Sequence, residues 1–531
     1  MIDVVIRGAR VIDGSGAPAF TADIGVAGSR VAFVGRAPGA APATEIEGDG
    51  LLLTPGLIDP HSHSDWSILS NRDALSTVHQ GVTTEIVGNC GVTYAPIAKG
   101  DEETARRALA AFGYQGDVRW RSFADFLSVV HDGGTAQNLA WFVGHTALRR
   151  AAEREQGDLI AGMEKHLHGA LEAGALGFTS GLEYGAGRTA TTGELEALAR
   201  VAGRYGAMYA SHIRNRDAAL AEAVDEFFRV VHAGEVRAQL SHLNVRHGTG
   251  AAEGAWLDAV ARLESELRSG VDVLADMTPY PHGIGLAAGL LPDWLLSAGE
   301  GAAAEALRDP AVRRRVREDF DRYWRFVHRG QWDRVRLAVS PATPEWEGMV
   351  FPDIAAANGT DEWDAYFDVM AAAGGDLGTV QLMGSLFEPE HVAEAVHHDR
   401  FLLGVDGFTS RRDGVLGART PHPLFFHGSQ HFLSHHALRV GTLTLEAAVH
   451  KMTGAVAAHF GLRDRGLVVE GAFADLVLWD EALLRDTDTF VMPESYATAA
   501  RHVWVNGVPV VSHGSRTVHR PGTRLERSDV H

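Results

Sequence analysis

Two histidines separated by one residue, His61 and His63, follow directly after an apolar run, residues 51–60. Side chains on a β-strand alternate between its two faces, so these two imidazoles project to the same side. Two imidazoles that face one way at the end of a buried strand can bind one metal ion. A second apolar run, residues 83–87, is followed by Cys90, the only cysteine of the chain. These residues indicate a metal site near the ends of two strands.

Other residues of metal-binding or acid–base type stand at the ends of further predicted strands. They are His145, His212, His242, Asp276 and Asp406. Taken singly, a histidine in such a place is commonly a hydrogen-bonded rim residue, and an aspartate before glycine commonly belongs to a turn. Taken together, imidazole, thiolate and carboxylate groups form a ligand set that suits zinc. We therefore predict one zinc site that all these strands share.

These side chains can meet only if the strands that carry them are parallel and end at the same edge. The middle of the chain alternates apolar strand-like segments with amphipathic helical segments, which is typical of parallel α/β structure. The eight predicted strands are residues 52–58, 83–87, 139–143, 175–179, 207–210, 238–241, 271–275 and 401–405. Eight such units predict a (β/α)8 barrel, in which active sites lie at the C-terminal ends of the strands.

Both ends of the chain contain short strand-like segments with turn signals, such as Asn506-Gly507. We predict that residues 1–54 and 464–531 form one β-sandwich, with the metal-dependent barrel of residues 55–463 inserted between them. The stretch between the seventh and eighth predicted strands is too long for one helix. Residues from about 285 to about 345 are therefore expected to form a helical insertion over the barrel mouth.

Composition narrows the class of protein. A chain of 531 residues exceeds what one compact core usually holds, so more than one structural unit is expected. The net charge of -20 argues against a nucleic-acid surface and against docking on anionic lipid. A single cysteine excludes an intramolecular disulfide, and no apolar run is long enough to cross a bilayer. We expect a cytoplasmic enzyme without membrane or nucleic-acid partners; the sequence leaves open whether it forms a homo-oligomer.

Several segments, in their order along the chain, resemble the amidohydrolase superfamily and most closely the N-acyl-D-amino-acid deacylase (D-aminoacylase) family. They are residues 55–63, 81–91, 144–145, 174–184, 209–214, 241–242, 279–280, 451–453 and 471–476. The resemblance covers nearly the whole chain. In that family a cysteine replaces the carboxylated lysine of hydantoinases and dihydroorotases, and Cys90 stands at that position.

The resemblance implies a role for each ligand-type residue. Cys90, His212 and His242 would hold the tighter zinc ion. His61, His63 and Asp406, with Cys90 bridging, would form a second site, which gives one or two Zn²⁺ per chain. Asp406 would take a proton from water and pass it to the departing nitrogen. His145 would donate to the developing oxyanion or brace a ligand, unless it is an ordinary rim histidine.

The substrate implied by the resemblance is a small N-acyl compound, in the first place an N-acyl-D-amino acid, with Tyr184 and Tyr280 in the substrate pocket. Two family residues that anchor the substrate carboxylate are replaced here, an arginine by Leu424 and a serine by Ile284. A carboxylate without donors in an apolar pocket is costly.

Two explanations of these replacements remain. Either another arginine binds the carboxylate, with Arg214, Arg411, Arg412 and Arg419 as the candidates, or the substrate is a neutral amide, cyclic amide, carbamate or ester. A non-enzymatic scaffold is the third hypothesis, but scaffold relatives usually lose ligand residues, and every ligand type is present here.

Three further histidines, His427, His431 and His435, recur every fourth residue. On a helix they would share one face. This spacing favours a polar helix face near the barrel rim over a further metal site.

Overall fold

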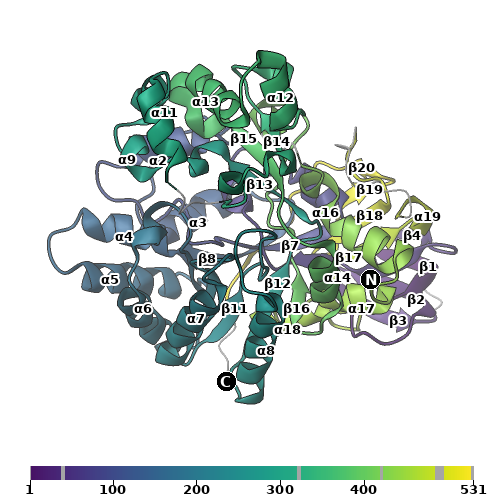
Figure 1. Ribbon diagram of the computed structural model, residues 1–531. Coiled ribbons are helices and arrows are strands. Elements are labelled where there is room, and N and C mark those ends of the chain that lie inside the picture. The colour runs from purple at the N-terminus through teal and green to yellow at the C-terminus, as the bar shows by residue number, and fades with distance from the viewer. Residues whose placement is uncertain (1, 38–41, 320–323, 419–421, 485–494, 528–531) are drawn as a thin grey trace.

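Eight parallel strands lie side by side at the centre of the computed structural model, which describes residues 2–37, 42–319, 324–418, 422–484 and 495–527 (Figure 1). In order they are β6 (Leu57–Asp59), β7 (Val82–Val87), β8 (Asn138–Gly144), β9 (Gly177–Gly181), β10 (Met208–His212), β11 (Arg237–Leu240), β12 (Val273–Met277) and β16 (Phe401–Leu403). A parallel bridge between Ser62 and Gly407 brings the first strand beside the last and nearly closes the sheet. The predicted (β/α)8 barrel is confirmed.

The barrel strands are apolar on both faces because both faces are buried. Residues inside the barrel, such as Ile86, Phe142 and Met208, form one cluster. The outer faces pack against helices that include α4 (His145–Glu153), α5 (Leu159–Glu172), α6 (Thr192–Arg204), α7 (Leu220–Gly234) and α8 (Ala255–Arg268). Helix α6 begins after Thr191, whose side chain accepts a hydrogen bond from the Glu194 amide. None of the helices in the described ranges combines the length and the hydropathy that crossing a membrane requires.

The first predicted strand, residues 52–58, is in fact two strands that belong to different sheets. Strand β5 (Leu52–Pro55) lies in the terminal sheet, and β6 begins the barrel at Leu57. Gly56 lies between them, and a Cβ atom there would come within 2.1 Å of the Thr83 hydroxyl oxygen. A glycine is therefore required where the chain crosses against β7.

Both ends of the chain contribute to one nine-stranded sheet. Its strands are β1 (Val4–Val11), β2 (Phe20–Ala27), β3 (Arg30–Gly35), β4 (Thr44–Glu47), β5, β17 (Leu476–Trp479), β18 (Ala500–Val505), β19 (Val508–Ser512) and β20 (Ser515–Arg516). The antiparallel pairing of β5 with β17 joins the N-terminal strands to the C-terminal ones. The last strand, β21 (Arg524–Leu525), departs from the expected arrangement because it pairs with β8 of the barrel.

A long insertion follows β12 and forms a separate layer at the top of Figure 1. It contains α9 (Asp293–Leu296), α10 (Glu300–Ala306), α11 (Pro310–Arg317), α12 (Phe351–Asn358) and α13 (Glu362–Ala373). It also contains an antiparallel sheet of β13 (His282–Leu286), β14 (Val335–Val339) and β15 (Gln381–Ser385). The insertion extends well beyond residue 345, because its central strand β15 begins at Gln381. It is also not purely helical, since it contains this three-stranded sheet.

Candidate metal centre

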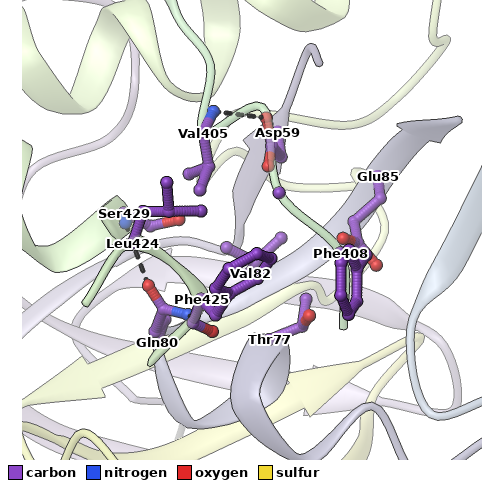
Figure 2. Close-up of a pocket in the computed structure, with 11 residues that line it drawn as sticks. Asp59, Thr77, Gln80, Val82, Glu85, Val405, Phe408, Leu424, Phe425 and Ser429 are labelled. Atoms are coloured by element: carbon purple, nitrogen blue, oxygen red, sulfur yellow. Dashed lines mark hydrogen bonds between the residues drawn. The ribbon is translucent and has the colours of Figure 1, made fainter. Parts of the chain in front are cut away.

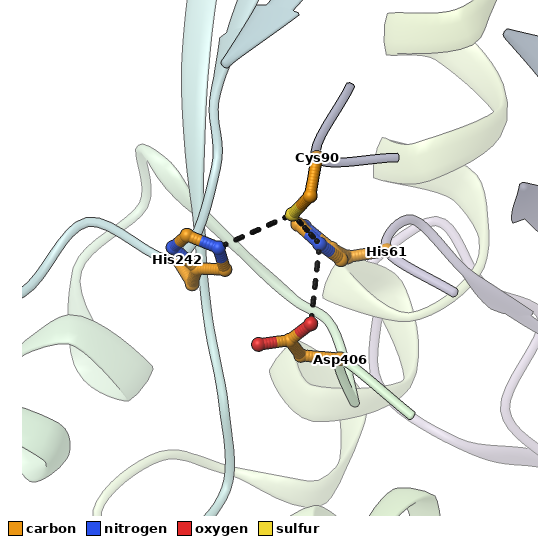
Figure 3. A group of neighbouring side chains, drawn as sticks. All are labelled: His61, Cys90, His242 and Asp406. Carbon is orange, nitrogen blue, oxygen red and sulfur yellow. Dashed lines mark hydrogen bonds and ion pairs between the residues drawn. The ribbon is translucent and has the colours of Figure 1, made fainter. Parts of the chain in front are cut away.

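Four side chains of ligand type converge just beyond the C-terminal ends of four barrel strands. They are His61, Cys90, His242 and Asp406, whose ligand atoms all lie within 4.8 Å of one another (Figure 3). The Cys90 Sγ atom lies 3.2 Å from His61 Nε2 and 3.5 Å from His242 Nε2. His61 Nε2 lies 3.4 Å from Asp406 Oδ1. The thiol and imidazoles are buried, whereas the Asp406 side chain is 32% exposed, so the carboxylate faces the open side of the group.

Three of these four residues have a left-handed backbone. The φ angles are 54° at Cys90, 35° at His242 and 56° at Asp406. This region is unfavourable for residues other than glycine. Each of the three residues follows a barrel strand at the point where the chain turns away, and the turn aims its side chain into the group. Strain that gathers at three neighbouring positions is typical of a functional site.

Asp276, at the end of β12, fixes the orientation of two members of the group. His61 Nδ1 lies 3.1 Å from Asp276 Oδ1, so Nε2 of the same ring faces the centre. The His242 backbone amide donates to the same carboxylate oxygen at 3.0 Å. A carboxylate that accepts from the outer nitrogen of a histidine is the usual support of a metal ligand. The sequence placed Asp276 at a strand end, but gave no signal for this role.

Two buried carboxyl groups hold the segment that carries His61 and His63. Ser62, which points the opposite way, donates to Glu85 Oε1 at 2.7 Å. Asp59 Oδ1 accepts from the His61 amide at 3.0 Å and from the Val405 amide at 3.1 Å. Burial, together with the charge of Glu85, raises the pKa of Asp59 to about 8. Asp59, Glu85 and Val405 line one cavity (Figure 2). Through its two hydrogen bonds Asp59 positions both His61 and the segment that leads to Asp406.

His63 and His212 lie at the border of the group. His63 Nε2 is 3.1 Å from Asp406 Oδ1, and its ring stacks on Trp66. The His212 ring centroid is 4.5 Å from that of His242, but His212 Nε2 is hydrogen-bonded to Glu183 Oε2 at 2.8 Å. His63 therefore contacts the group through the Asp406 carboxylate, and His212 contacts it through the His242 ring.

The chemistry of the donor set fits a zinc ion. Burial opposes ionisation of Cys90, but the charges of His61 and His242 and a hydrogen bond from His212 bring the pKa of the thiol well below its ordinary value. The thiolate is the form of cysteine that binds metals. A thiolate with imidazoles and a carboxylate is a typical ligand set for zinc.

A buried ion-pair network behind His212 was not predicted. Glu183 Oε2 accepts hydrogen bonds from His212, Arg246 and Arg216, and Arg246 also pairs with Asp217 at 3.0 Å. Arg216 Nη1 lies 3.2 Å from His242 Nδ1. Despite burial, the two guanidinium groups and His212 keep the pKa of Glu183 well below its ordinary value. The only sequence signal was the alternation of His212, Arg214 and Arg216, which does not show which arginine turns inward.

Two residues predicted for the substrate pocket have other partners. The Arg214 guanidinium binds Glu226, with Nε to Oε2 at 2.8 Å, and also donates to backbone carbonyls. His145 Nε2 is hydrogen-bonded to Glu194 Oε1 at 2.9 Å, which links α4 to α6. Tyr184, in contrast, adjoins the group, because its hydroxyl donates to the Cys90 carbonyl oxygen at 3.2 Å.

The other candidate arginines in the described residues also have partners outside the group. Arg411 pairs with Asp413 at 2.9 Å, and the Arg412 guanidinium lies over the Phe426 ring. Arg419 falls outside the described residues.

Tyr280 and Leu424 belong to one apolar cluster beside Asp406. The cluster contains Tyr280, Val405, Leu424, Phe425 and Phe426, with Ile284 packed against it. Burial raises the pKa of Tyr280 above its ordinary value. Val405 precedes Asp406 directly, so the positions at which the sequence departs from the family pattern form an apolar wall next to the exposed carboxylate.

A nearly closed (β/α)8 barrel, with thiolate, imidazole and carboxylate groups at its C-terminal rim and a β-sheet from both termini, is the architecture of a metal-dependent amidohydrolase. Residues 354–511 match the model of the Amidohydrolase family. Over 99% of its length the chain is 31% identical to the D-aminoacylase of Alcaligenes xylosoxydans xylosoxydans, of which 98% is covered. It is 32% identical to the N-acyl-D-glutamate deacylase of the same organism, over 99% of the chain and 97% of that protein.

A solved structure agrees with these relatives. It is the N-acyl-D-glutamate deacylase of Bordetella bronchiseptica complexed with zinc and a phosphonate inhibitor that mimics the tetrahedral intermediate. It superposes with a TM-score of 0.80 at 27% identity, covering 99% of this chain and all of the other. The chain belongs to the N-acyl-D-amino-acid deacylase (D-aminoacylase) family of the amidohydrolase superfamily, whose members are hydrolases of carbon–nitrogen bonds other than peptide bonds.

Replacing Asp276 by asparagine is expected to weaken metal binding by about 10- to 100-fold, since it removes the charged acceptor behind His61. Competition with a chromogenic chelator measures this affinity. Asp475→Asn is the matched control, because Asp475 is a buried aspartate that pairs with Arg465 beside the terminal sheet. Equal affinities of wild type and Asp276→Asn would exclude the supporting role.

Proposed function

We propose that this enzyme hydrolyses the amide bond of N-acyl-D-amino acids with the help of zinc. The observation that carries the proposal is the convergence of His61, Cys90, His242 and Asp406 at the barrel rim. The two relatives from Alcaligenes are a D-aminoacylase and an N-acyl-D-glutamate deacylase, and the Bordetella enzyme was solved with zinc. The two Alcaligenes relatives support the substrate class, and the Bordetella structure supports the metal.

In this proposal Cys90, His212 and His242 hold the tighter ion, and His61, His63 and Asp406 hold a second ion with Cys90 bridging. Two contacts support the assignment. His212 Nε2 is taken by Glu183, which leaves Nδ1 as the nitrogen that can bind metal. The Cys90 Sγ atom lies between His61 Nε2 and His242 Nε2, where a bridging ligand belongs.

Asp406 is the proposed general base and general acid. When bound, a zinc ion supplies Lewis acidity to the acyl carbonyl and makes water easier to deprotonate. Burial opposes ionisation of Asp406, but the charges of His61 and His242 hold its pKa below the ordinary value, so the carboxylate can accept a proton. The hydrogen bond with His63 orients it. Asp406 then gives the proton to the nitrogen, which leaves poorly unless protonated.

A second candidate function is hydrolysis of a neutral amide, cyclic amide, carbamate or ester by the same site. The apolar cluster around Tyr280 and Leu424, with Ile284 against it, favours this alternative. Of Tyr280, Leu424 and Ile284 only the Tyr280 hydroxyl can donate a hydrogen bond, so a carboxylate buried against these side chains would be poorly satisfied. Arg214, one of the candidate replacements, is already paired with Glu226.

The kinetics of paired substrates distinguish the two functions. The zinc-loaded enzyme is assayed by kcat/KM with N-acetyl-D-amino acids, with their L-enantiomers and with the carboxamide of each compound. We expect turnover of the D-acids, and most of all of those with apolar side chains, because the wall beside Asp406 is apolar. Turnover of the carboxamides alone would reject the deacylase proposal and support the second candidate. Failure of all three series would reject the deacylase proposal and the neutral-amide form of the second candidate.

A further inference from the structure

A second group of histidines lies outside the metal centre and contacts Tyr280. Helix α16 (Leu424–His431) continues into a π-helical segment, η8 (Phe432–Arg439). His431 at the end of α16 and His435 and His436 in η8 offer ligand atoms that all lie within 4.8 Å of one another. A π-helical turn is one residue wider than an α-helical turn, so it brings positions 431 and 436 together. The group therefore differs from the predicted face, since it includes His436 and not His427.

Two nitrogens in this group are buried and have no hydrogen-bond partner among the residues that the structure describes. They are His431 Nδ1 and His436 Nδ1, on residues that are only 3% and 4% exposed. An unsatisfied buried polar atom is unfavourable and requires an explanation. His436 Nε2 lies 3.1 Å from the Pro279 carbonyl oxygen, which can only accept, so Nε2 carries the proton and Nδ1 the lone pair. This is the usual arrangement of a histidine that binds metal.

The three rings are held close together and uncharged. Ring centroids are 4.5 Å apart for His431 and His435, 4.9 Å for His435 and His436, and 5.5 Å for His431 and His436. Burial lowers the pKa of His431 to about 2 and that of His436 to about 4, and it also lowers the pKa of His435. Neutral imidazoles do not repel one another and leave their lone pairs available to a cation.

One positive charge opposes a cation at this place. The Arg439 guanidinium donates to His435 Nδ1 at 2.6 Å. Arg439 is exposed at the helix end, so its side chain can turn into solvent and release this nitrogen. On the other side the Tyr280 ring stacks on His431, with centroids 4.2 Å apart. The group thus adjoins the apolar cluster of Tyr280 and Leu424, which we assign to the substrate pocket.

We propose that His431, His435 and His436 bind one divalent first-row transition metal ion, at a site separate from the catalytic centre. Three imidazole nitrogens favour zinc, nickel or copper, whereas magnesium and calcium require oxygen ligands. The site goes beyond the proposed hydrolysis, because none of its ligands belongs to the group at the barrel rim.

Nickel binding to the zinc-loaded enzyme tests the proposal. Ni²⁺ is titrated by calorimetry, and both metals are then counted after gel filtration, so that displacement of catalytic zinc is detected. We expect one Ni²⁺ per chain with zinc retained. Removing one of three ligands, in His431→Ala or His436→Ala, should weaken nickel binding by more than about tenfold. His427→Ala, one turn earlier on the same helix, should bind as wild type does.

Arg439→Ala provides a variant that alters only an exposed side chain. It removes a nearby positive charge and frees His435 Nδ1, so nickel affinity should rise by about tenfold. Three results would each overturn the proposal. They are nickel binding that appears only with loss of zinc, nickel affinities of the His431 and His436 variants equal to that of wild type, and loss of nickel binding in His427→Ala. If the histidine variants do not fold, unchanged affinity in Arg439→Ala would overturn it.

Discussion

Asp406→Asn is expected to lower kcat by about 10²- to 10⁴-fold, which is the usual contribution of a general acid–base residue. Asparagine keeps the size of the side chain but can neither accept the proton of water nor deliver it to the departing nitrogen. The partly exposed carboxylate of Asp406, with His63 Nε2 at 3.1 Å and His61 Nε2 at 3.4 Å, suits this exchange. Steady-state kinetics of zinc-loaded enzyme measure the change.

Metal content has to be measured alongside these kinetics because Asp406 is also a proposed ligand of the second ion. Asp413→Asn serves as the matched control, since Asp413 is an exposed aspartate seven positions later that pairs with Arg411. A large loss of kcat with the tighter zinc ion still bound supports the proton-transfer role. An Asp406→Asn enzyme with nearly wild-type kcat at equal zinc content would refute it.

Cys90→Ala is expected to remove bound zinc and activity together. Cys90 is the only cysteine of the chain, so no neighbouring thiol can take its place. Alanine leaves a small side chain with the same positive φ of 54°, so the backbone gains no new strain. The metal loses the one ligand that lies between His61 and His242. Zinc per chain by atomic absorption, together with kcat, measures both losses.

The same experiment separates loss of metal from loss of fold. The thermal unfolding of Cys90→Ala should match that of wild type stripped by a chelator, and zinc should restore activity only to the stripped wild type. Acid should also release the metal from wild type, because protons compete for the thiolate and for neutral imidazoles, so zinc binding weakens as the pH falls. A Cys90→Ala enzyme that keeps stoichiometric zinc and full activity would exclude Cys90 as a ligand.

The sequence by itself determined the barrel and which residue types stand at its rim. Alternation along a strand is local, so His61 and His63 could be assigned to one side from their spacing. Apolar runs between amphipathic helices identified the eight strands, although position 56, where one predicted strand divides between two sheets, could not be recognised. There the glycine is required by contact with Thr83, on the neighbouring strand.

Only the tertiary structure decided which of these residues meet and which neighbours they have. His63 and Asp406 are 343 positions apart, and their contact depends on closure of the barrel. The inward aim of Cys90 and His242 depends on left-handed turns that follow their strands. Spacing along the chain fixes the direction of a side chain relative to its own strand or helix. The partner of a side chain in another segment is fixed by the packing of distant parts of the chain. For this reason the contacts of Asp276, Arg216 and His436 could be identified only in the folded chain.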